Sequence, residues 1–224
     1  MSPTRRYGIF GGTFNPIHLG HLALAEAARE QCRPDRVYFI PTATPPHKRA
    51  SDVIDGRHRL AMVRLAIRGH PAFRVSDLEL RRGGISYTLR TVQELTRREP
   101  SASWFLIVGS DMLAVPWRGL DEIAQRCTFV VGERPSTVAR SRFSRIRRIE
   151  IPQLAISSSM IRQRIRHRHS IRYLVPEAVA TKLVHALESK RPKFRYYVTL
   201  PSYAVALLRR MLPAGALDAV ARRN

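Results

Sequence analysis

Short apolar runs alternate with amphipathic segments along most of this chain. The runs predict buried strands over residues 6–10, 36–41, 73–80, 104–109, 128–131 and 148–151. Between them, apolar residues recur at three- and four-residue spacing and predict helices over residues 22–30, 55–68, 88–98, 120–126, 159–166 and 176–188. This alternation favours a Rossmann-like α/β fold, a doubly wound parallel sheet with helices on both faces.

The pattern changes near the C-terminus. Residues 1–189 carry the alternation and are predicted to form a single domain. Residues 190–224 form a basic C-terminal extension that begins with Lys190-Arg191-Pro192-Lys193. Three interpretations of this extension remain open: a packed extra helix, a disordered appendage, and an amphipathic segment on a membrane surface, favoured in that order.

The segment that follows the first apolar run has the properties of a phosphate site. It reads GGTFNPIHLGH over residues 11–21. Gly11 and Gly12 are expected to turn the chain tightly and to bring backbone N–H groups close to a ligand. The helix that follows adds unpaired N–H donors at its N-terminus. His18 and His21 are three residues apart, so both project to one side of a helical turn and can donate to phosphoryl oxygens.

A second polar motif follows the last predicted strand. It reads ISSSMIR over residues 156–162, and Ser157 or Ser158 is placed to cap the helix that begins there. Both motifs therefore lie beyond the carboxyl ends of strands, where open α/β sheets bind ligands. Each histidine taken alone is more typical of a core side chain, but the pair behind a glycine turn favours the phosphate site.

Composition adds one unusual property, a formal net charge of +22 over 224 residues. The charge is spread over many segments with little aromatic interleaving, so a basic surface around an anionic substrate explains it, and nucleic acid is not expected as a specific partner. Cys32 and Cys127 predict free buried thiols in a reducing compartment. No apolar run approaches the ~20 residues of a membrane span, and no signal-peptide core is present, which predicts a soluble, cytoplasmic protein.

The two motifs together resemble the HxGH and ISSTxIR signatures of the nucleotidyltransferase superfamily, with Ser159 where threonine is usual. The resemblance extends over roughly residues 6–188. It implies that His18, His21 and Arg162 are catalytic. It also implies an ATP and phosphate site made of Gly12, Thr13, Phe14, Lys48, Gly109, Asp111, Ile156, Ser157 and Ser158.

Three further segments resemble bacterial nicotinate-nucleotide adenylyltransferases. They are the PPHK loop over residues 45–48, a RxGxSYT-like segment that ends at Thr88, and a GxD segment over 109–111 that is followed by Trp117. The resemblance implies transfer of AMP from ATP to nicotinate mononucleotide, giving deamido-NAD and pyrophosphate in NAD biosynthesis. It assigns the nicotinate nucleotide to His47, Tyr87, Thr88 and Trp117, and implies Mg²⁺ bound mainly through ATP phosphates.

Two positions depart from the family pattern. Arg90 stands where an acidic residue is usual, which leaves the preference for the acid over the amide less certain. Asn15 stands where aspartate is common and is expected to be tolerated, since both residues favour the same turn. Relatives acting on nicotinamide mononucleotide or phosphopantetheine, and a basic nucleic-acid-binding protein with a vestigial site, remain alternatives. The oligomeric state is open, with a homo-oligomer as one option.

Overall fold

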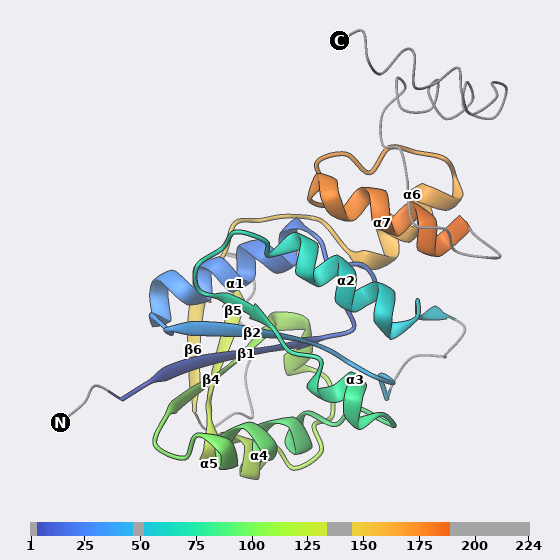
Figure 1. Ribbon diagram of the computed structural model, residues 1–224. Helices are drawn as coiled ribbons and strands as arrows, with labels where there is room; N and C mark the ends of the chain where they lie inside the picture. The colour runs from blue at the N-terminus through green and yellow to red at the C-terminus, as the bar shows by residue number, and fades with distance from the viewer. Residues whose placement is uncertain (1–3, 47–51, 134–144, 189–224) are drawn as a thin grey trace, which may run out of the picture.

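The computed structural model describes residues 4–46, 52–133 and 145–188, and these residues contain a six-stranded parallel sheet (Figure 1). The strands are β1 (Arg6–Gly12), β2 (Arg36–Pro41), β3 (Phe73–Val75), β4 (Ser103–Gly109), β5 (Thr128–Glu133) and β6 (Ile146–Glu150). Their order in the sheet is β3-β2-β1-β4-β5-β6. The chain thus builds outward from β1, crosses back to β4 and builds outward again, so the doubly wound prediction is confirmed.

Helices cover both faces of this sheet (Figure 1). One buried cluster contains side chains of the sheet, α1 (Leu19–Cys32), α2 (Gly56–Ala66), α6 (Ser158–Arg166) and α7 (Glu177–Glu188), and in it α7 packs on α2. The other packs α4 (Thr88–Arg98) and α5 (Leu120–Arg126) against the opposite face. Two short elements, α3 (Leu78–Arg82) and the 3₁₀ helix η2 (Ser110–Leu113), follow β3 and β4.

Most predicted elements are confirmed, and residues 73–80 are the main error. The structure limits the strand to Phe73–Val75, which pairs with Val37–Phe39 of β2. The chain then turns, and the Ser76 hydroxyl accepts a hydrogen bond from the Leu78 N–H as α3 begins. Alternation over eight residues predicted a longer strand, but Leu78 and Glu79 are consecutive and both buried, as in a helix.

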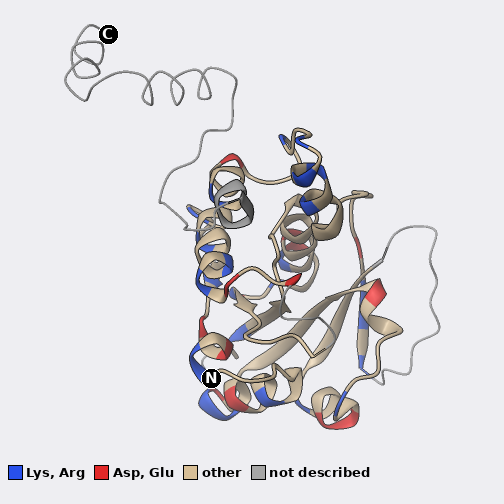
Figure 2. Cartoon of the chain, turned by 90° about the vertical axis from the view of Figure 1, so that its right-hand side faces the viewer, with Lys and Arg blue, Asp and Glu red and all other residues tan. Residues whose placement is uncertain are grey.

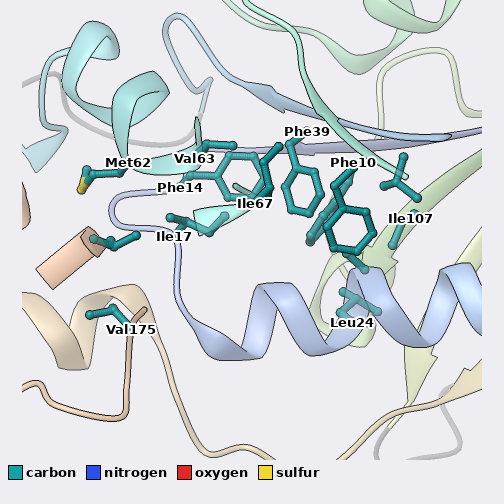
Figure 3. Close-up of a cluster of buried hydrophobic side chains, with 14 of the residues drawn as sticks. Phe10, Phe14, Ile17, Leu24, Phe39, Met62, Val63, Ile67, Ile107 and Val175 are labelled. Atoms are coloured by element: carbon teal, nitrogen blue, oxygen red, sulfur yellow. The ribbon is translucent and has the colours of Figure 1, made fainter. Parts of the chain in front are cut away.

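The loop between β1 and α1 rests directly on the hydrophobic core. The Phe14 ring packs edge-on against Phe10, with centroids 5.5 Å apart, and lies 6.0 Å from Phe39. Ile17, from the same loop, is fully buried. Figure 3 shows Phe14 and Ile17 among side chains from the sheet and α2. Core packing therefore fixes the position of the loop that carries the first motif.

Charged side chains are distributed over several helices, with acidic residues among the basic ones (Figure 2). In the described parts of the chain, no helix has the length and apolar character needed to cross a membrane. Cys32 and Cys127 are free and buried, as predicted, and burial raises the pKa of both thiols, that of Cys127 to about 12. The extension over 190–224 lies outside the described residues, so its boundaries and structure stay predictions.

Candidate active site

The turn after β1 is made by Phe14 rather than by the two glycines. Gly11 and Gly12 belong to β1, and neither has a positive φ, whereas Phe14 has φ 46° in the left-handed region. Gly12 is needed for a different reason, because a Cβ there would lie 3.1 Å from the Phe14 ring. The predicted turn at the two glycines was therefore wrong in position, because the chain turns at Phe14. The predicted loop close to the end of β1 is present.

The two signature histidines stack at the start of α1. His18 is the N-cap residue of the helix, and its ring centroid lies 3.7 Å from that of His21. The His18 backbone N–H donates to Nδ1 of His21 over 3.2 Å. Because Nδ1 accepts this bond, a neutral His21 carries its proton on Nε2. The prediction that both rings share one side of the helix is confirmed.

His18 is buried, with 7% of its surface exposed, and its Nδ1 atom has no hydrogen-bond partner within the described residues. Burial lowers the pKa of His18 to about 4. A Cβ on Gly20 would lie 3.1 Å from that same Nδ1, so a larger residue there would crowd the ring. His18 is thus uncharged at neutral pH and can act as a neutral hydrogen-bond donor.

The His18 pKa predicts a dependence of stability on pH. The folded-state value lies below the unfolded value of 6.5, so the unfolded chain takes up a proton first as the pH falls. The contribution of His18 is complete above pH 6.5, is lost between pH 6.5 and 4, and amounts to about 3 kcal/mol. Urea unfolding at pH 7 and pH 4 should show a smaller loss for His18→Leu than for wild type. The exposed His167→Asn serves as the control. If His18→Leu and wild type lose equal unfolding free energy between pH 7 and pH 4, the predicted role of His18 is contradicted.

Two side chains of the second motif, those of Ser158 and Arg162, bond to the loop that carries the first motif, and a third, Ser157, caps α6. The Ser157 hydroxyl accepts from the Met160 N–H and caps α6, as predicted. The Ser158 hydroxyl donates to the Pro16 carbonyl at 2.8 Å, and Arg162 Nη1 donates to the Asn15 carbonyl at 2.7 Å. Residues about 140 positions apart therefore meet at the loop after β1. Both serine hydroxyls have structural partners, and their predicted contacts with phosphate stay predictions.

Arg162 is half-buried. Burial is the main cause that lowers the pKa of its guanidinium, and the charge of the nearby Arg166 lowers this pKa further. The side chain keeps its charge at neutral pH, because arginine does not deprotonate in proteins. Ile156 precedes this group, and its carbonyl lies 3.8 Å from the position of a Cβ on Gly20. The second signature thus places a cation at the loop that leads into the histidine pair.

The end of β4 adds Gly109 and Asp111. A Cβ on Gly109 would collide with the carboxylate of Asp111, which folds back over the strand end. Because β4 is the neighbour of β1 in the sheet, Asp111 lies at the same edge as the loop between β1 and α1. This exposed carboxylate has the chemistry to accept hydrogen bonds from ribose hydroxyls.

The residues predicted for the nicotinate nucleotide form a second group. Tyr87 and Thr88 stand at the start of α4, and the Arg118 guanidinium lies 4.8 Å from the centre of the Tyr87 ring. A Cβ on Gly119 would lie 2.6 Å from Leu89, so the loop after Trp117 packs on the first turn of α4. Trp117 donates its indole N–H to the Met112 carbonyl at 2.8 Å.

The Trp117 ring is half-buried and packs edge-on against Phe129, with centroids 5.6 Å apart. These contacts are also those of a core side chain, and its predicted stacking on a pyridine ring stays a prediction. Arg118 was not predicted from the sequence, where only its position next to Trp117 could have indicated it. His47 and Lys48 lie outside the described residues.

Asn15 does more than preserve a turn. Its side chain is buried, its Nδ2 donates to the Asp52 carbonyl at 2.8 Å, and its Oδ1 accepts from the Ile54 N–H at 3.1 Å. An aspartate in this position has no N–H to donate to Asp52. The amide of Asn15 therefore connects the loop between β1 and α1, through hydrogen bonds, to the segment that leads into α2.

Arg59 is the functional candidate that sequence reasoning missed. Its side chain is 1% exposed and makes four hydrogen bonds to backbone carbonyls, one of them that of Thr13. The signal was present, since Arg59 lies three and four residues before the buried Met62 and Val63 and so shares their face of α2.

Comparison with known proteins shows the family to which the chain belongs. Residues 9–164 match the cytidylyltransferase-like family. A probable nicotinate-nucleotide adenylyltransferase of Oceanobacillus iheyensis is 42% identical over 177 residues, which are 78% of this chain and 92% of that protein. The corresponding protein of Salinibacter ruber is 46% identical over 178 residues, 77% and 91% of the two chains.

The fold is similar to that of a solved structure. Plasmodium falciparum nicotinic acid mononucleotide adenylyltransferase complexed with NaAD superposes with a TM-score of 0.67. The two chains are 19% identical, and the match covers 79% of this chain and 93% of that one. At this identity the likeness supports the fold alone.

Proposed function

Because this chain belongs to the nicotinate-nucleotide adenylyltransferases of the cytidylyltransferase-like family, we propose that it transfers AMP from ATP to nicotinate mononucleotide. The products are deamido-NAD and pyrophosphate, which places the enzyme in NAD biosynthesis. One observation carries the proposal: His18, His21 and Arg162, from two distant signatures, gather around the loop that follows β1.

The chemistry needs little covalent work from the protein. A phosphate oxygen of nicotinate mononucleotide attacks the α-phosphorus of ATP, a P–O bond forms, and the bond from the α-phosphorus to the bridging oxygen breaks with its electrons on pyrophosphate. The protein's part is to position the phosphates and to stabilise the charge that develops on them. His21 donates through Nε2, Arg162 supplies a full positive charge, and the first turn of α1 adds backbone N–H donors.

Mg²⁺ is part of the proposal as a companion of ATP. Within the described residues, no three His, Cys, Asp or Glu side chains are grouped so as to hold a metal ion. The groups around the loop are imidazoles and a guanidinium, which can donate to phosphate oxygens, whereas Mg²⁺ prefers oxygen ligands. We therefore expect ATP phosphates and water to hold the ion, as Mg²⁺ commonly requires, and assign it no ligand in the chain.

The preference for the acid substrate is a finer part of the proposal. Thr88 is the first residue of α4, where the helix dipole and main-chain N–H groups favour a carboxylate. An amide would present N–H to N–H there and leave donors unpaired. Arg90 is the third residue of α4 and is exposed, so it adds positive charge near this end of the helix from outside.

The test is pyrophosphate release from ATP and Mg²⁺ with nicotinate mononucleotide, nicotinamide mononucleotide or phosphopantetheine offered separately. We expect turnover of the acid alone and its loss in His18→Ala, because the buried ring of His18 stacks on that of His21. If the wild type turns over the acid and the amide equally and Arg90→Asp prefers the acid, Arg90 weakens the selectivity of the pocket. No turnover of any acceptor would reject the function.

Two further parts of the proposal concern surroundings and partners. We place the enzyme in the cytoplasm, which its two buried free thiols support.

We assign it no specific nucleic-acid partner, and the distribution of basic side chains over several helices supports this (Figure 2). A homo-oligomer remains an option. Salt-titrated nucleic-acid binding, with and without residues 190–224, would separate adhesion by the extension from a second function.

A further inference from the structure

Arg59 carries a buried positive charge whose partners are all backbone carbonyls. Its Nε donates to Ile54 at 2.8 Å, and its Nη1 donates to Thr13 at 2.8 Å. Its Nη2 donates to Thr42 at 2.7 Å and to Ala43 at 3.3 Å. Four of the five N–H groups of the guanidinium are thus used. A buried charge is costly, so a structure that retains one commonly gains a specific geometry from it.

The bond to Thr13 determines the orientation of one peptide group. The peptide unit between Thr13 and Phe14 is planar, and in its trans form the carbonyl and the N–H point in opposite directions. Since the Thr13 carbonyl points at Arg59, the Phe14 N–H points away from it. Within the described residues, this N–H has no hydrogen-bond partner. A donor fixed in this way, in the loop beside His18 and His21, suits a phosphate oxygen.

The charge on Arg59 strengthens that donor as well as aiming it. A carbonyl that accepts from a cation is polarised, and its amide N–H becomes a better donor. Burial lowers the pKa of Arg59, while Asp55 and the buried Glu79 oppose this effect. The guanidinium remains charged at neutral pH, since arginine does not deprotonate in proteins.

Two of the other carbonyls, those of Thr42 and Ala43, connect the loop between β1 and α1 to the second half of the site. Thr42 and Ala43 follow β2, and the Ala43 N–H donates to the Ser86 hydroxyl at 2.9 Å. The Ser86 N–H in turn donates to the Thr44 carbonyl at 2.9 Å. Ser86 directly precedes Tyr87 and Thr88. Arg59 therefore connects the loop of the first signature to the segment assigned to the nicotinate nucleotide, because it donates to Thr13 and to Ala43, and Ala43 donates to Ser86.

We propose that Arg59 is a positioning residue for adenylyl transfer: it aims the Phe14 N–H at the reacting phosphates and holds that loop at a fixed distance from the residue 42–44 and 86–88 segments. The inference rests on the proposed function for its effect on turnover. Arg59 itself touches no substrate, since its guanidinium is buried against the four carbonyls. Lysine in its place keeps the charge, but a single ammonium cannot reach carbonyls arranged around a planar fork.

The first experiment measures kcat and the KM of each substrate for Arg59→Lys. We expect kcat to fall by about 10- to 100-fold, since a small misplacement of a donor at the reacting phosphates has effects of this size. Each KM should change by less than about threefold, because aim matters most in the transition state. Val63→Ala, a buried truncation on the same helix, controls for lost stability, and the exposed Arg64→Lys controls for the substitution itself. Both should keep kcat within about twofold of wild type. A kcat for Arg59→Lys that matches Val63→Ala at an equal drop in Tm would overturn the proposal.

The second experiment does not depend on turnover, and its wild-type measurement does not depend on any variant folding. The ¹H–¹⁵N resonance of Phe14 in the full-length wild type should move on addition of Mg²⁺ and ATP alone. This shift should be lost in Arg59→Lys and kept in Val63→Ala. A Phe14 resonance that ATP leaves unmoved in the wild type rejects the inference even if the enzyme is active. A shift that requires Arg59, in a protein that adenylates no acceptor, supports the inference on ATP binding and rejects the proposed function.

Discussion

We expect His21→Ala to lower kcat for adenylyl transfer by about 100- to 10,000-fold, the range typical when a positioned proton-bearing group is removed from a reaction centre. The reason lies in the tautomer. The His18 backbone N–H occupies Nδ1 of His21, which leaves the proton on Nε2. The substitution removes this donor and also the acceptor for the N-cap N–H, so unfolding free energy should fall by about 1 kcal/mol.

The matched variant His21→Gln separates these two losses. His21 is the third residue of α1, and glutamine at this position can accept from the N-cap N–H as in a capping box. Stability measured by urea unfolding should therefore return to the wild-type value, while kcat stays at least about tenfold lower because the donor is displaced. Full activity in either variant would show that His21 only caps the helix.

Arg162→Met lowers kcat/KM for ATP by about 100- to 1,000-fold, as loss of a charged donor at a phosphoryl site commonly does. Arg162 stands on α6, its Nη1 holds the Asn15 carbonyl, and its charge lies at the loop where the phosphates are proposed to bind. Arg162→Lys keeps the charge and loses the planar fork, so an intermediate loss is expected. Initial rates at several ATP concentrations give both values.

Arg166→Met is the control, because Arg166 is exposed and stands one turn further along the same helix. It removes the same charge from α6 while leaving the bond to Asn15 intact, and kcat/KM for ATP should remain within about threefold of wild type. Equal losses in the two variants would assign the effect to the general field of the basic surface, and the specific role of Arg162 would then be rejected.

The sequence predicted the regular elements well where local pattern and tertiary structure agree. Residues 36–41, 88–98 and 120–126 form β2, α4 and α5 with the predicted bounds, because their apolar periodicity matches the faces that they bury. The proximity of His18 and His21 could be predicted for the same reason: a spacing of three residues fixes two side chains on one helical turn.

Contacts between distant segments could not be predicted in this way. The turn at Phe14 depends on a ring that packs on Phe10 and Phe39, which no local pattern reveals. The cation of Arg118 over Tyr87 joins residues far apart in the chain. Arg59 is the clearest case, since its partners are carbonyl groups, and every residue has one regardless of its side chain.

The reactivity of the two buried cysteines with thiol reagents reports on local unfolding of this protein. Thiol reagents react with the thiolate, and burial disfavours that form at Cys32 and Cys127 while the fold is intact. Cys32 ends α1, behind the histidine pair, and Cys127 precedes β5 on the opposite face of the sheet. The rate at which each thiol becomes chemically accessible therefore tells whether the two faces of the sheet open separately or together.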